Sequence, residues 1–398
     1  MVLISSLKPF LPKNPEEFCT NPYDVISKEE ELELKKNPKS LIHLILPDGI
    51  GEEIYQNALK AFEKFKKEKI IIREKESCIF VYRQESDQFS HQGLILGVSL
   101  EDYESGNIIK HEHTREKPLE DRTKHITTTK VSAGLVWTVF KTNKEINDLI
   151  ENIKKQKPLF DFKKLGYRHL LWKEMDVDII ESLKKLFLNE KLYIADGHHR
   201  AASAAEYRKL KMKEKSKKNP NAPWHYLLTY VASDDQVRIL PYNRIVKKLP
   251  ISEVEFLAQI KKDFDVLPIK SSFNPSRKNE IGLYLKGEWY KLLVKEKKFK
   301  SIRDSLDVAI LQDKILGPIL KIYDPRADEN IFFLGGLLEL KRMEKYIIEE
   351  GNDLFINLYP VSITDLEAIS AEGGVMPPKS TWFDPKVLSG LVLHTLEE

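Results

Sequence analysis

The sequence has few cysteines and no long apolar run. Cys19 and Cys78 are the only cysteines among 398 residues. They are too few for a disulfide framework, and neither lies in a CxxC or Cys/His pattern that would bind zinc. No uncharged apolar stretch of about 18 residues is present, and the first residues lack a basic region leading into an apolar run. We therefore expect a soluble cytoplasmic protein with reduced thiols and no membrane partner.

The sequence also lacks a large net charge and two common catalytic motifs. Lys and Arg number 64 against 61 Asp and Glu, a net charge of +3, whereas nucleic-acid-binding proteins usually contain a markedly basic domain. We therefore expect no nucleic-acid partner. The absence of GxxxxGK[ST] excludes a P-loop mechanism, and Gly-x-Ser-x-Gly is absent as well.

The length and the apolar pattern predict two α+β domains. At roughly 150 residues per domain, 398 residues predict two domains, and we place the boundary near residue 245, where a lysine-rich stretch begins. The early β-α-β-β order predicts a mixed sheet with flanking helices. The periodicity predicts strands at residues 41–46, 78–83, 94–100, 135–140, 169–172 and 191–195, helices at 28–36, 51–69, 144–155 and 178–188, and a hairpin of 226–232 with 236–240.

Two polar segments fit this pattern less well. Residues 103–122 crowd His, Glu, Thr, Arg and Lys together, and we expect a helix that begins there and is interrupted at Pro118. Residues 208–218 contain seven basic residues and one acidic residue. We expect this second segment to be a solvated helix end and loop.

The strongest local signal is the segment Asp196-Gly197-His198-His199-Arg200, which follows an apolar strand and begins an alanine-rich helix. Backbone N–H groups at a helix N-terminus lack intrahelical acceptors and lie at the positive end of the dipole, so this turn can bind a phosphate. Arg200 would add a bidentate donor, and His198 or His199 a proton shuttle or a hydrogen-bond donor. The structural alternative is that Asp196 caps the helix, Gly197 makes the turn and the histidines are surface residues.

Basic side chains in the first helical turn favour the phosphate hypothesis. Each cation at the positive end of the dipole is unfavourable by about 0.3–1 kcal/mol, so we expect an anion there. If Arg200 faces this anion, Arg200→Ala should leave the ligand-free protein as stable as the parent. It should also weaken phosphate binding roughly ten- to a hundredfold.

A second cluster of polar residues, 111–122, offers the remaining groups of a phosphoryl-transfer site. If its first part is helical, His111 faces Arg115, and Glu112 becomes available as a metal ligand or general base. Lys117 and Arg122 would be phosphate donors. The structural alternative is an exposed helix with i,i+4 charge pairs. A zinc site of His111, His113 and His125 is less favoured, because His-x-His on a helix separates the rings by about 200°.

Two loops carry further candidates. Tyr23 and Asp24 precede a helix that Ser27 should cap, and Asp24 is either part of that turn or a base or metal ligand. Residues 376–381, Met-Pro-Pro-Lys-Ser-Thr, form a stiff strip rich in hydrogen-bond donors. This strip is either a surface turn or an anion contact, and we expect it to fold back onto the Asp196 turn.

Four motifs, in order along nearly the whole chain, resemble the domain-of-unknown-function 1015 (DUF1015) family: Pro-Tyr-Asp-Val-Ile at 22–26, His111-Glu112-x-Thr114 with Lys117 and Asp121-Arg122, the 196–200 turn, and residues 376–381. Through its Asp-Gly-His-x-Arg turn, that family is similar to the ParB/sulfiredoxin superfamily, which includes the ADP-dependent free serine kinase. The free serine kinase has a threonine at the position of His199.

The resemblance implies a ParB/sulfiredoxin-like mixed sheet in residues 1–245, a second α+β domain in residues 246–398, and a nucleotide phosphate at the 196–200 turn. The implied function is a nucleotide-dependent phosphotransferase acting on a small hydroxyl compound or phosphorylated metabolite. Serine or phosphoserine is the first candidate substrate, and the implied cofactors are ADP or ATP and Mg²⁺. The alternative is a non-catalytic regulatory protein that binds a nucleotide or phosphometabolite. The oligomeric state stays open.

The motifs assign roles to individual side chains. His198, Glu112 and Asp24 are the expected catalytic residues, and Glu112 is also the expected metal ligand. The substrate is expected to contact Tyr23, His111 and Thr114. The expected cofactor-binding residues are Asp196, Gly197, His199, Arg200, Arg122, Lys117, Lys379, Ser380 and Thr381.

Overall fold

The computed structural model describes the chain except for residues 113, 215–218, 220, 297, 337–338 and 398. The chain divides into two compact units: unit 1 is Met1–Val237 with Pro385–Glu398, and unit 2 is Arg238–Asp384. The chain thus enters unit 2 close to the expected boundary near residue 245, but its last residues return to unit 1. No described helix is long and apolar enough to cross a membrane.

Unit 1 is built around a nine-stranded mixed sheet with the strand order β6-β11-β8-β12-β5-β4-β10-β9, in which β1 also pairs with β5. β11 with β6 and β12 with β8 are parallel pairs, and the other pairs are antiparallel. The strands are β1 Ile4–Ser5, β4 Ile79–Glu85, β5 Ser90–Ser99, β6 Ile108–Ile109, β8 Val136–Phe140, β9 Phe160–Lys164, β10 Tyr167–Glu174, β11 Leu192–Asp196 and β12 Tyr226–Ser233. An α+β mixed sheet with flanking helices is therefore confirmed.

The two faces of this sheet differ in character because side chains alternate along each strand. In β5, Leu94, Leu96 and Val98 join one apolar core with residues of α7 and α8. The opposite face carries buried polar rings with partners: Tyr82 Oη donates to His169 Nδ1 (2.7 Å) and Tyr230 Oη to His91 Nδ1 (3.1 Å). His169, which precedes a predicted apolar strand, is thus a core histidine whose Nε2 donates to a backbone carbonyl (3.0 Å).

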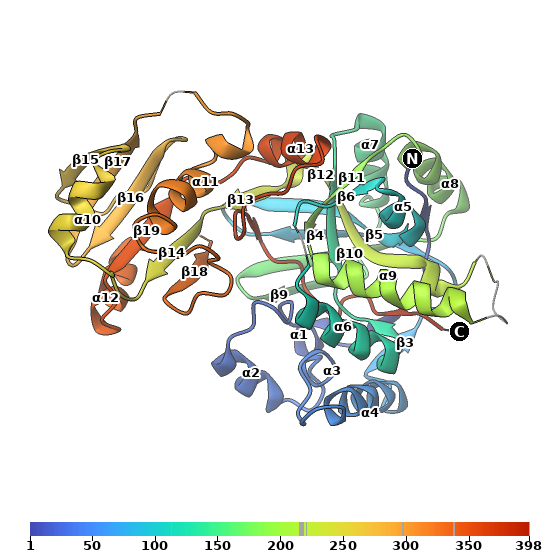
Figure 1. Ribbon diagram of the computed structural model, residues 1–398. Coiled ribbons are helices and arrows are strands. Elements are labelled where there is room, and N and C mark those ends of the chain that lie inside the picture. Colours follow the sequence, from blue (N-terminus) through green and yellow to red (C-terminus); the bar gives the residue numbers. More distant parts are fainter. Residues whose placement is uncertain (113, 215–218, 220, 297, 337–338, 398) are drawn as a thin grey trace. The chain divides into compact units, whose positions relative to one another are not determined.

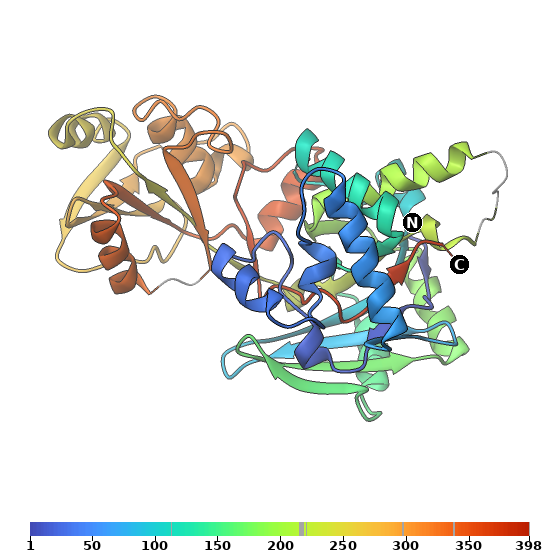
Figure 2. The ribbon, with the colours of Figure 1, turned by 90° about the horizontal axis from the view of Figure 1, so that it is seen from below.

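Helices lie on both sides of the sheet. In Figure 1, α7 and α8 lie on one side, and α3 and α4 on the opposite side; Figure 2 shows α4 in front of the strands. α6 contacts both α4 and α9. The helices are α1 Pro15–Phe18, α2 Lys28–Lys35, α3 Ile42–Ile45, α4 Glu53–Lys67, α5 Leu100–Ser105, α6 Glu116–Thr129, α7 Lys144–Ile153, α8 Val177–Phe187 and α9 His198–Lys213.

The returning C-terminal segment is tied into unit 1 by backbone pairing. β21 (His394–Thr395) pairs with β7 (Val131–Ser132), and isolated bridges join Leu393 to Phe10 and Ser389 to Thr20. A second two-stranded sheet joins β2 (Phe10–Pro12) to β3 (Ile71–Arg73). This pairing brings residues from the end of the chain beside the strand that ends at Asp196.

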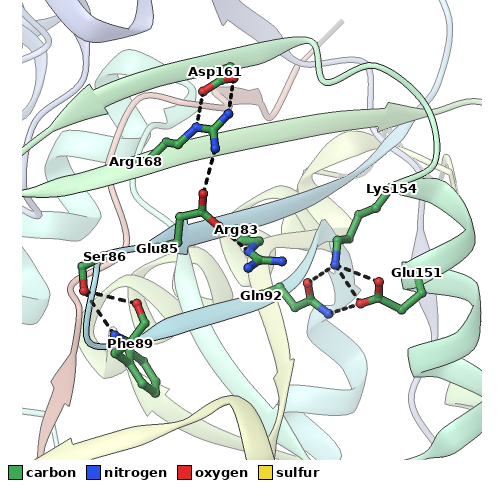
Figure 3. A network of polar contacts seen from close by, with 9 residues as sticks. All are labelled: Arg83, Glu85, Ser86, Phe89, Gln92, Glu151, Lys154, Asp161 and Arg168. Carbon is green, nitrogen blue, oxygen red and sulfur yellow. Dashed lines mark hydrogen bonds and ion pairs between the residues drawn. The ribbon is translucent and has the colours of Figure 1, made fainter.

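A charged network links the outer strands β4, β9 and β10 (Figure 3). Arg168 donates to both carboxylate oxygens of Asp161 (2.8 and 2.7 Å) and to Glu85 (3.0 Å), which also pairs with Arg83 (2.9 Å). β9 is an edge strand. Charged side chains at an edge disfavour pairing with another chain.

Unit 2 contains a six-stranded antiparallel sheet with the order β15-β17-β16-β19-β14-β18. Leu283 and Leu285 pack with α10 and α11 on one face, while Tyr284 and Phe355 pack with α12 on the other. The elements are β13 Arg238–Leu240, β14 Tyr242–Val246, β15 Phe264–Ile269, β16 Glu280–Leu285, β17 Glu288–Val294, β18 Ile331–Gly335, β19 Leu354–Leu358, β20 Trp382–Asp384, α10 Glu253–Ile260, α11 Asp307–Leu311, α12 Leu340–Glu349 and α13 Ile363–Ala371.

Three local predictions are wrong. Residues 41–46 contain the short helix α3 instead of a strand, because a short apolar run does not by itself distinguish the two. Residues 226–232 and 236–240 do not pair with each other: β12 pairs with β5 and β8, and β13 with β20. Pro118 does not interrupt a helix. It lies in the first turn of α6, where a backbone N–H has no intrahelical acceptor to lose.

The basic segment 208–218 is only partly solvated. Arg208 is buried and donates to Glu104 (2.5 Å), and Lys211 is buried and pairs with Glu397 (2.6 Å). Residues 215–218 lie outside the described residues. The first half of this segment therefore contributes to packing through ion pairs.

Candidate functional site

The Asp196 turn has the predicted strand-turn-helix geometry. β11 ends at Asp196, Gly197 has a φ of 96°, which suits glycine, and α9 begins at His198. α9 has no side-chain cap and no acidic residue in its first turn. Asp196 therefore does not cap the helix, and α9 begins without a side-chain cap.

Small side chains fix the position of α9. Ala201, Ala204 and Ala205 are buried in the core of the sheet, and Ser203 is also buried. A helix with such side chains can approach the sheet and α6 closely. The start of α9 is thereby held at the end of β11.

Arg200 folds back over the turn and forms an internal ion pair. Its Nη2 donates to Asp196 Oδ2 (2.9 Å) and its Nη1 to the Leu135 carbonyl. A Cβ added at Gly197 would lie 3.1 Å from the Arg200 guanidinium, so the glycine also makes room for this side chain. The expectation that Arg200 offers an open fork to a ligand is thus corrected: Asp196 and a backbone carbonyl occupy two of its nitrogens.

Asp196 lies between two cations. Its Oδ1 is 3.6 Å from Lys386 Nζ, opposite the Arg200 contact. Burial alone would raise the pKa of this carboxyl, but Lys386, Arg200 and His198 outweigh burial and hold the pKa well below its usual range. Asp196, Arg200 and Lys386 together carry a net charge of about +1 at neutral pH.

His111 and His198 meet beside the turn. Their rings are 4.5 Å apart in an edge-to-face arrangement, and both side chains are buried. One nitrogen of His111 bonds to the backbone of Ile194, whereas His111 Nδ1 and His198 Nε2 have no partner among the described residues. Burial lowers the pKa of His111 to about 4. The pKa of His198 is held well below its usual range, first by burial and second by the nearby His111.

Glu112 completes a group of possible metal ligands. One donor atom each from His111, Glu112 and His198 lies within 4.8 Å of the others, and Glu112 is exposed. Residues 111–112 and 114–115 are not helical and lie between β6 and α6. The expected i,i+4 geometry of this segment is therefore wrong, although His111 and Glu112 do lie together with His198.

Of the residues of the alternative zinc site, only His111 and His125 lie among the described residues. His125 Nε2 donates to the Leu44 carbonyl (2.7 Å) and is buried among residues of α3 and α6. His113 lies outside the described residues.

Tyr23 and Arg122 contact each other and line a cavity together with Arg200. The Arg122 guanidinium is 4.5 Å from the centre of the Tyr23 ring and donates to Asp121 through two nitrogens (2.8 and 2.6 Å). Both residues, with Arg200, line a cavity of about 60 Å³, which is too small for a nucleotide. Asp24 is exposed. Burial by itself would lower the pKa of Arg200, but the nearby carboxylates of Asp196 and Asp24 raise it.

The remaining candidates of unit 1 are more exposed. His199 Nε2 accepts from the Arg115 backbone N–H (3.1 Å), which fixes the start of α6 against the start of α9. Thr114 is half-buried, and Lys117 is exposed in the first turn of α6.

The 376–381 loop belongs to unit 2. Lys379 is exposed with a φ of 54°, and its Nζ is 3.4 Å from Tyr242 Oη; Ser380 is buried and donates to the Pro377 carbonyl, and Thr381 is half-buried. The buried Arg244 donates to the Lys379 carbonyl (2.9 Å). The expected contact of this loop with the Asp196 turn stays a prediction.

Lys386 and Ser389 are site residues that the sequence pattern did not reveal. Ser389 lines the small cavity with Arg200. Both residues reach the turn through backbone pairing of the C-terminal segment, for which no local motif exists. A cavity of about 1400 Å³ lies elsewhere, at the β4–β5 and β9–β10 turns.

Comparisons with known proteins give a family and distant structural likenesses. The family model described as "Protein of unknown function (DUF1015)" matches residues 8–309. No curated protein matches the sequence. A mutant of free serine kinase in complex with AMP is similar at 12% identity and a TM-score of 0.38, over 73% of this chain and 87% of that chain. SbnI with C-terminal truncation from Staphylococcus aureus is similar at 10% identity and a TM-score of 0.38, over 74% and 85%.

Proposed function

The chain belongs to the DUF1015 family, and within this family of unknown function we propose that it is a nucleotide-dependent phosphotransferase acting on a small hydroxyl compound. The observation that carries the proposal is the uncapped start of α9 with the unpartnered, buried His198 Nε2 beside it. A helix N-terminus of this kind binds phosphate through backbone N–H groups. A buried imidazole next to it can act on the phosphate that is bound.

Electrostatics support an anion at this turn. Arg200 and Lys386 outnumber Asp196 by one charge, the nearby Asp24 offsets that excess, and Lys117 adds an exposed cation at the start of α6. The phosphates would be held by the N–H groups at Gly197–Arg200, His199 and Lys117. Arg122 and Arg200 would contribute mainly through their charge, since both are engaged with carboxylates.

In the proposed transfer, Asp24 accepts the proton of the acceptor hydroxyl. The hydroxyl oxygen forms a bond to the terminal phosphorus while the bond from that phosphorus to the bridging oxygen of the nucleotide breaks. The electron pair of the broken bond leaves with the nucleotide product. Tyr23, His111 and Thr114 would contact the acceptor, and His198 would contact the transferred phosphoryl group. Serine is the first acceptor to test, since the 196–200 turn resembles the free serine kinase segment.

The two expected cofactors fit the residues unequally. ADP or ATP fits a turn rich in backbone donors and positive charge. Mg²⁺ prefers oxygen ligands in octahedral geometry, whereas the ligand group here offers two imidazole nitrogens and one carboxylate. A magnesium ion held by this group is therefore not supported, and no step of the transfer is assigned to it.

The test separates binding from transfer. Isothermal titration with ATP, ADP, AMP and pyrophosphate, with and without divalent metal, should identify one nucleotide ligand. Phosphorus NMR of that nucleotide with serine or other small alcohols should then show a new phosphate ester. Asp24→Asn and His198→Ala should abolish transfer and keep nucleotide affinity, whereas Asp87→Asn, a matched change at an exposed hairpin residue, should alter neither.

Two outcomes would change the conclusion. Nucleotide binding without transfer to any acceptor would identify a regulatory binding protein instead of an enzyme. No nucleotide binding would overturn the proposal. Unchanged turnover in Lys379→Ala would remove the 376–381 loop from the site and leave the proposal for the Asp196 turn intact.

A further inference from the structure

His111 and His198 are an unusual pair of buried histidines. Their relative exposures are 4% and 7%, and each has a ring nitrogen, Nδ1 and Nε2 respectively, with no hydrogen-bond partner among the described residues. A buried polar atom without a partner destabilises the fold, because it has lost its bonds to water. By contrast, His91 and His169 in the same sheet have partners for both nitrogens.

The geometry of the pair matches that of metal ligands. The other nitrogen of His111 bonds to the backbone of Ile194, and metal-binding histidines nearly always use their second nitrogen in this way. Donor atoms of His111, His198 and Glu112 lie within 4.8 Å of one another. Ligand bonds of about 2.0–2.2 Å place donors roughly 3–3.5 Å apart, so side-chain shifts of about 1 Å would bring them into the coordination sphere.

We propose that His111 Nδ1, His198 Nε2 and Glu112 bind one divalent transition-metal ion of the class that prefers imidazole, such as Zn²⁺, Mn²⁺, Fe²⁺ or Co²⁺. Two nitrogens and one carboxylate oxygen favour such ions over Mg²⁺ or Ca²⁺, which take oxygen ligands. Three protein ligands leave coordination positions open, the arrangement of catalytic sites in contrast to closed structural ones.

The position of the site gives the ion a role. His198 is the first residue of α9, so an ion at its Nε2 lies next to the backbone N–H groups proposed to bind phosphate. An oxygen of the bound phosphate would complete the coordination and would be polarised there. Ion binding itself does not depend on the proposed function; only this contact with phosphate rests on it.

The experiment uses the untagged full chain, stripped of metal with a chelator. Titration with Co²⁺ should give the visible absorption bands of a site with mixed nitrogen and oxygen ligands at one ion per chain. Calorimetry with Zn²⁺, Mn²⁺ and Mg²⁺ should give the tightest binding for Zn²⁺ and the weakest for Mg²⁺. His111→Gln, His198→Gln and Glu112→Gln should each weaken Zn²⁺ binding by at least about tenfold, since changes outside the coordination sphere already cause that much.

Two matched substitutions are the controls. His43→Gln changes a half-buried histidine that already bonds to a backbone carbonyl, and Glu116→Gln changes an exposed carboxylate at the start of α6. Neither should alter metal binding. Because Glu112 is exposed, Glu112→Gln should fold normally even if a histidine variant does not.

Several results would overturn the proposal: no Co²⁺ absorption, equal affinity for Mg²⁺ and Zn²⁺, or Zn²⁺ binding that Glu112→Gln and both histidine variants leave unchanged. The pair would then be only an edge-to-face ring contact. Metal binding without nucleotide binding would support this site and contradict the proposed function. Nucleotide binding and transfer in a protein that binds no transition metal would support the proposed function and contradict this metal site.

Discussion

Arg200→Ala should destabilise the ligand-free protein around the Asp196 turn. The Arg200 side chain is 12% exposed and is the 2.9 Å partner of Asp196. Its removal would leave Asp196 with Lys386 at 3.6 Å, and the Leu135 carbonyl would lose its side-chain donor. The structure therefore reverses the expectation drawn from the sequence, in which Arg200→Ala left the stability of the ligand-free protein unchanged.

The magnitude follows from the burial of the pair. Removing one partner of a buried ion pair costs about 3–5 kcal/mol, because the other charge stays buried without compensation. Lys386 compensates part of the Asp196 charge, so we expect a loss of about 2–4 kcal/mol in the local free energy of opening. Arg200→Lys should recover only part of this loss, since an ammonium group cannot bond Asp196 and Leu135 with the same planar fork.

Hydrogen exchange followed by mass spectrometry suits this test, because it separates unit 1 from unit 2. Peptides covering β11 and the first turns of α9 should exchange faster in Arg200→Ala, whereas Arg168→Ala, which breaks an exposed ion pair, should leave them unchanged. In a double-mutant cycle, Asp196→Ala should relieve part of the Arg200→Ala defect, with a coupling of about 0.5–3 kcal/mol. Unchanged exchange in Arg200→Ala would show that the ion pair does not hold the turn and would refute this reasoning.

Three further changes test other parts of the structure. Gly197→Ala should destabilise unit 1 by about 1–3 kcal/mol, measured by hydrogen exchange, because Gly197 has a positive φ and an added Cβ would meet Arg200. The effect should exceed that of Gly51→Ala, since Gly51 also has a positive φ but its added Cβ would meet nothing within 4 Å. Burial raises the pKa of Asp307 to about 7. The stability of unit 2 should therefore fall as pH rises from about 4 to 7. Urea unfolding followed across this pH range should show a flatter dependence for Asp307→Asn. Arg244→Leu should speed amide exchange in residues 376–381, because Arg244 donates to the Lys379 carbonyl; unchanged exchange would contradict this role.

The parts of the fold that local chemistry determines were predictable. Ser27 caps α2 through the Glu30 N–H (3.1 Å), and α7 and α8 bury the apolar stripes that their periodicity indicated. The strand, glycine and alanine-rich helix at Asp196 belong to the same class, because each signal lies within a few residues of its effect. Residues 41–46 show the limit: a run without alternation does not distinguish a strand from a buried helix.

Features that depend on distant pairing were not predictable. Lys386 reaches Asp196 only because residues 389–395 pair with β7 and with the N-terminal segment. β13 pairs with β20, which is over 140 residues away in sequence, instead of with the neighbouring β12. A single sequence contains no signal for such partners.

The charges at the start of α9 differ from those that the sequence indicated. The sequence suggested three cations that oppose the helix dipole, but burial holds His198 neutral at pH 7, and Asp196 compensates Arg200 directly. The dipole therefore does not by itself require a ligand. What favours one is a set of three features: the start of α9 without a side-chain cap, and the two buried nitrogens without a partner among the described residues, His111 Nδ1 and His198 Nε2. Since an anion satisfies the first and a metal ion the other two, a metal-bound phosphate would satisfy all of them at once.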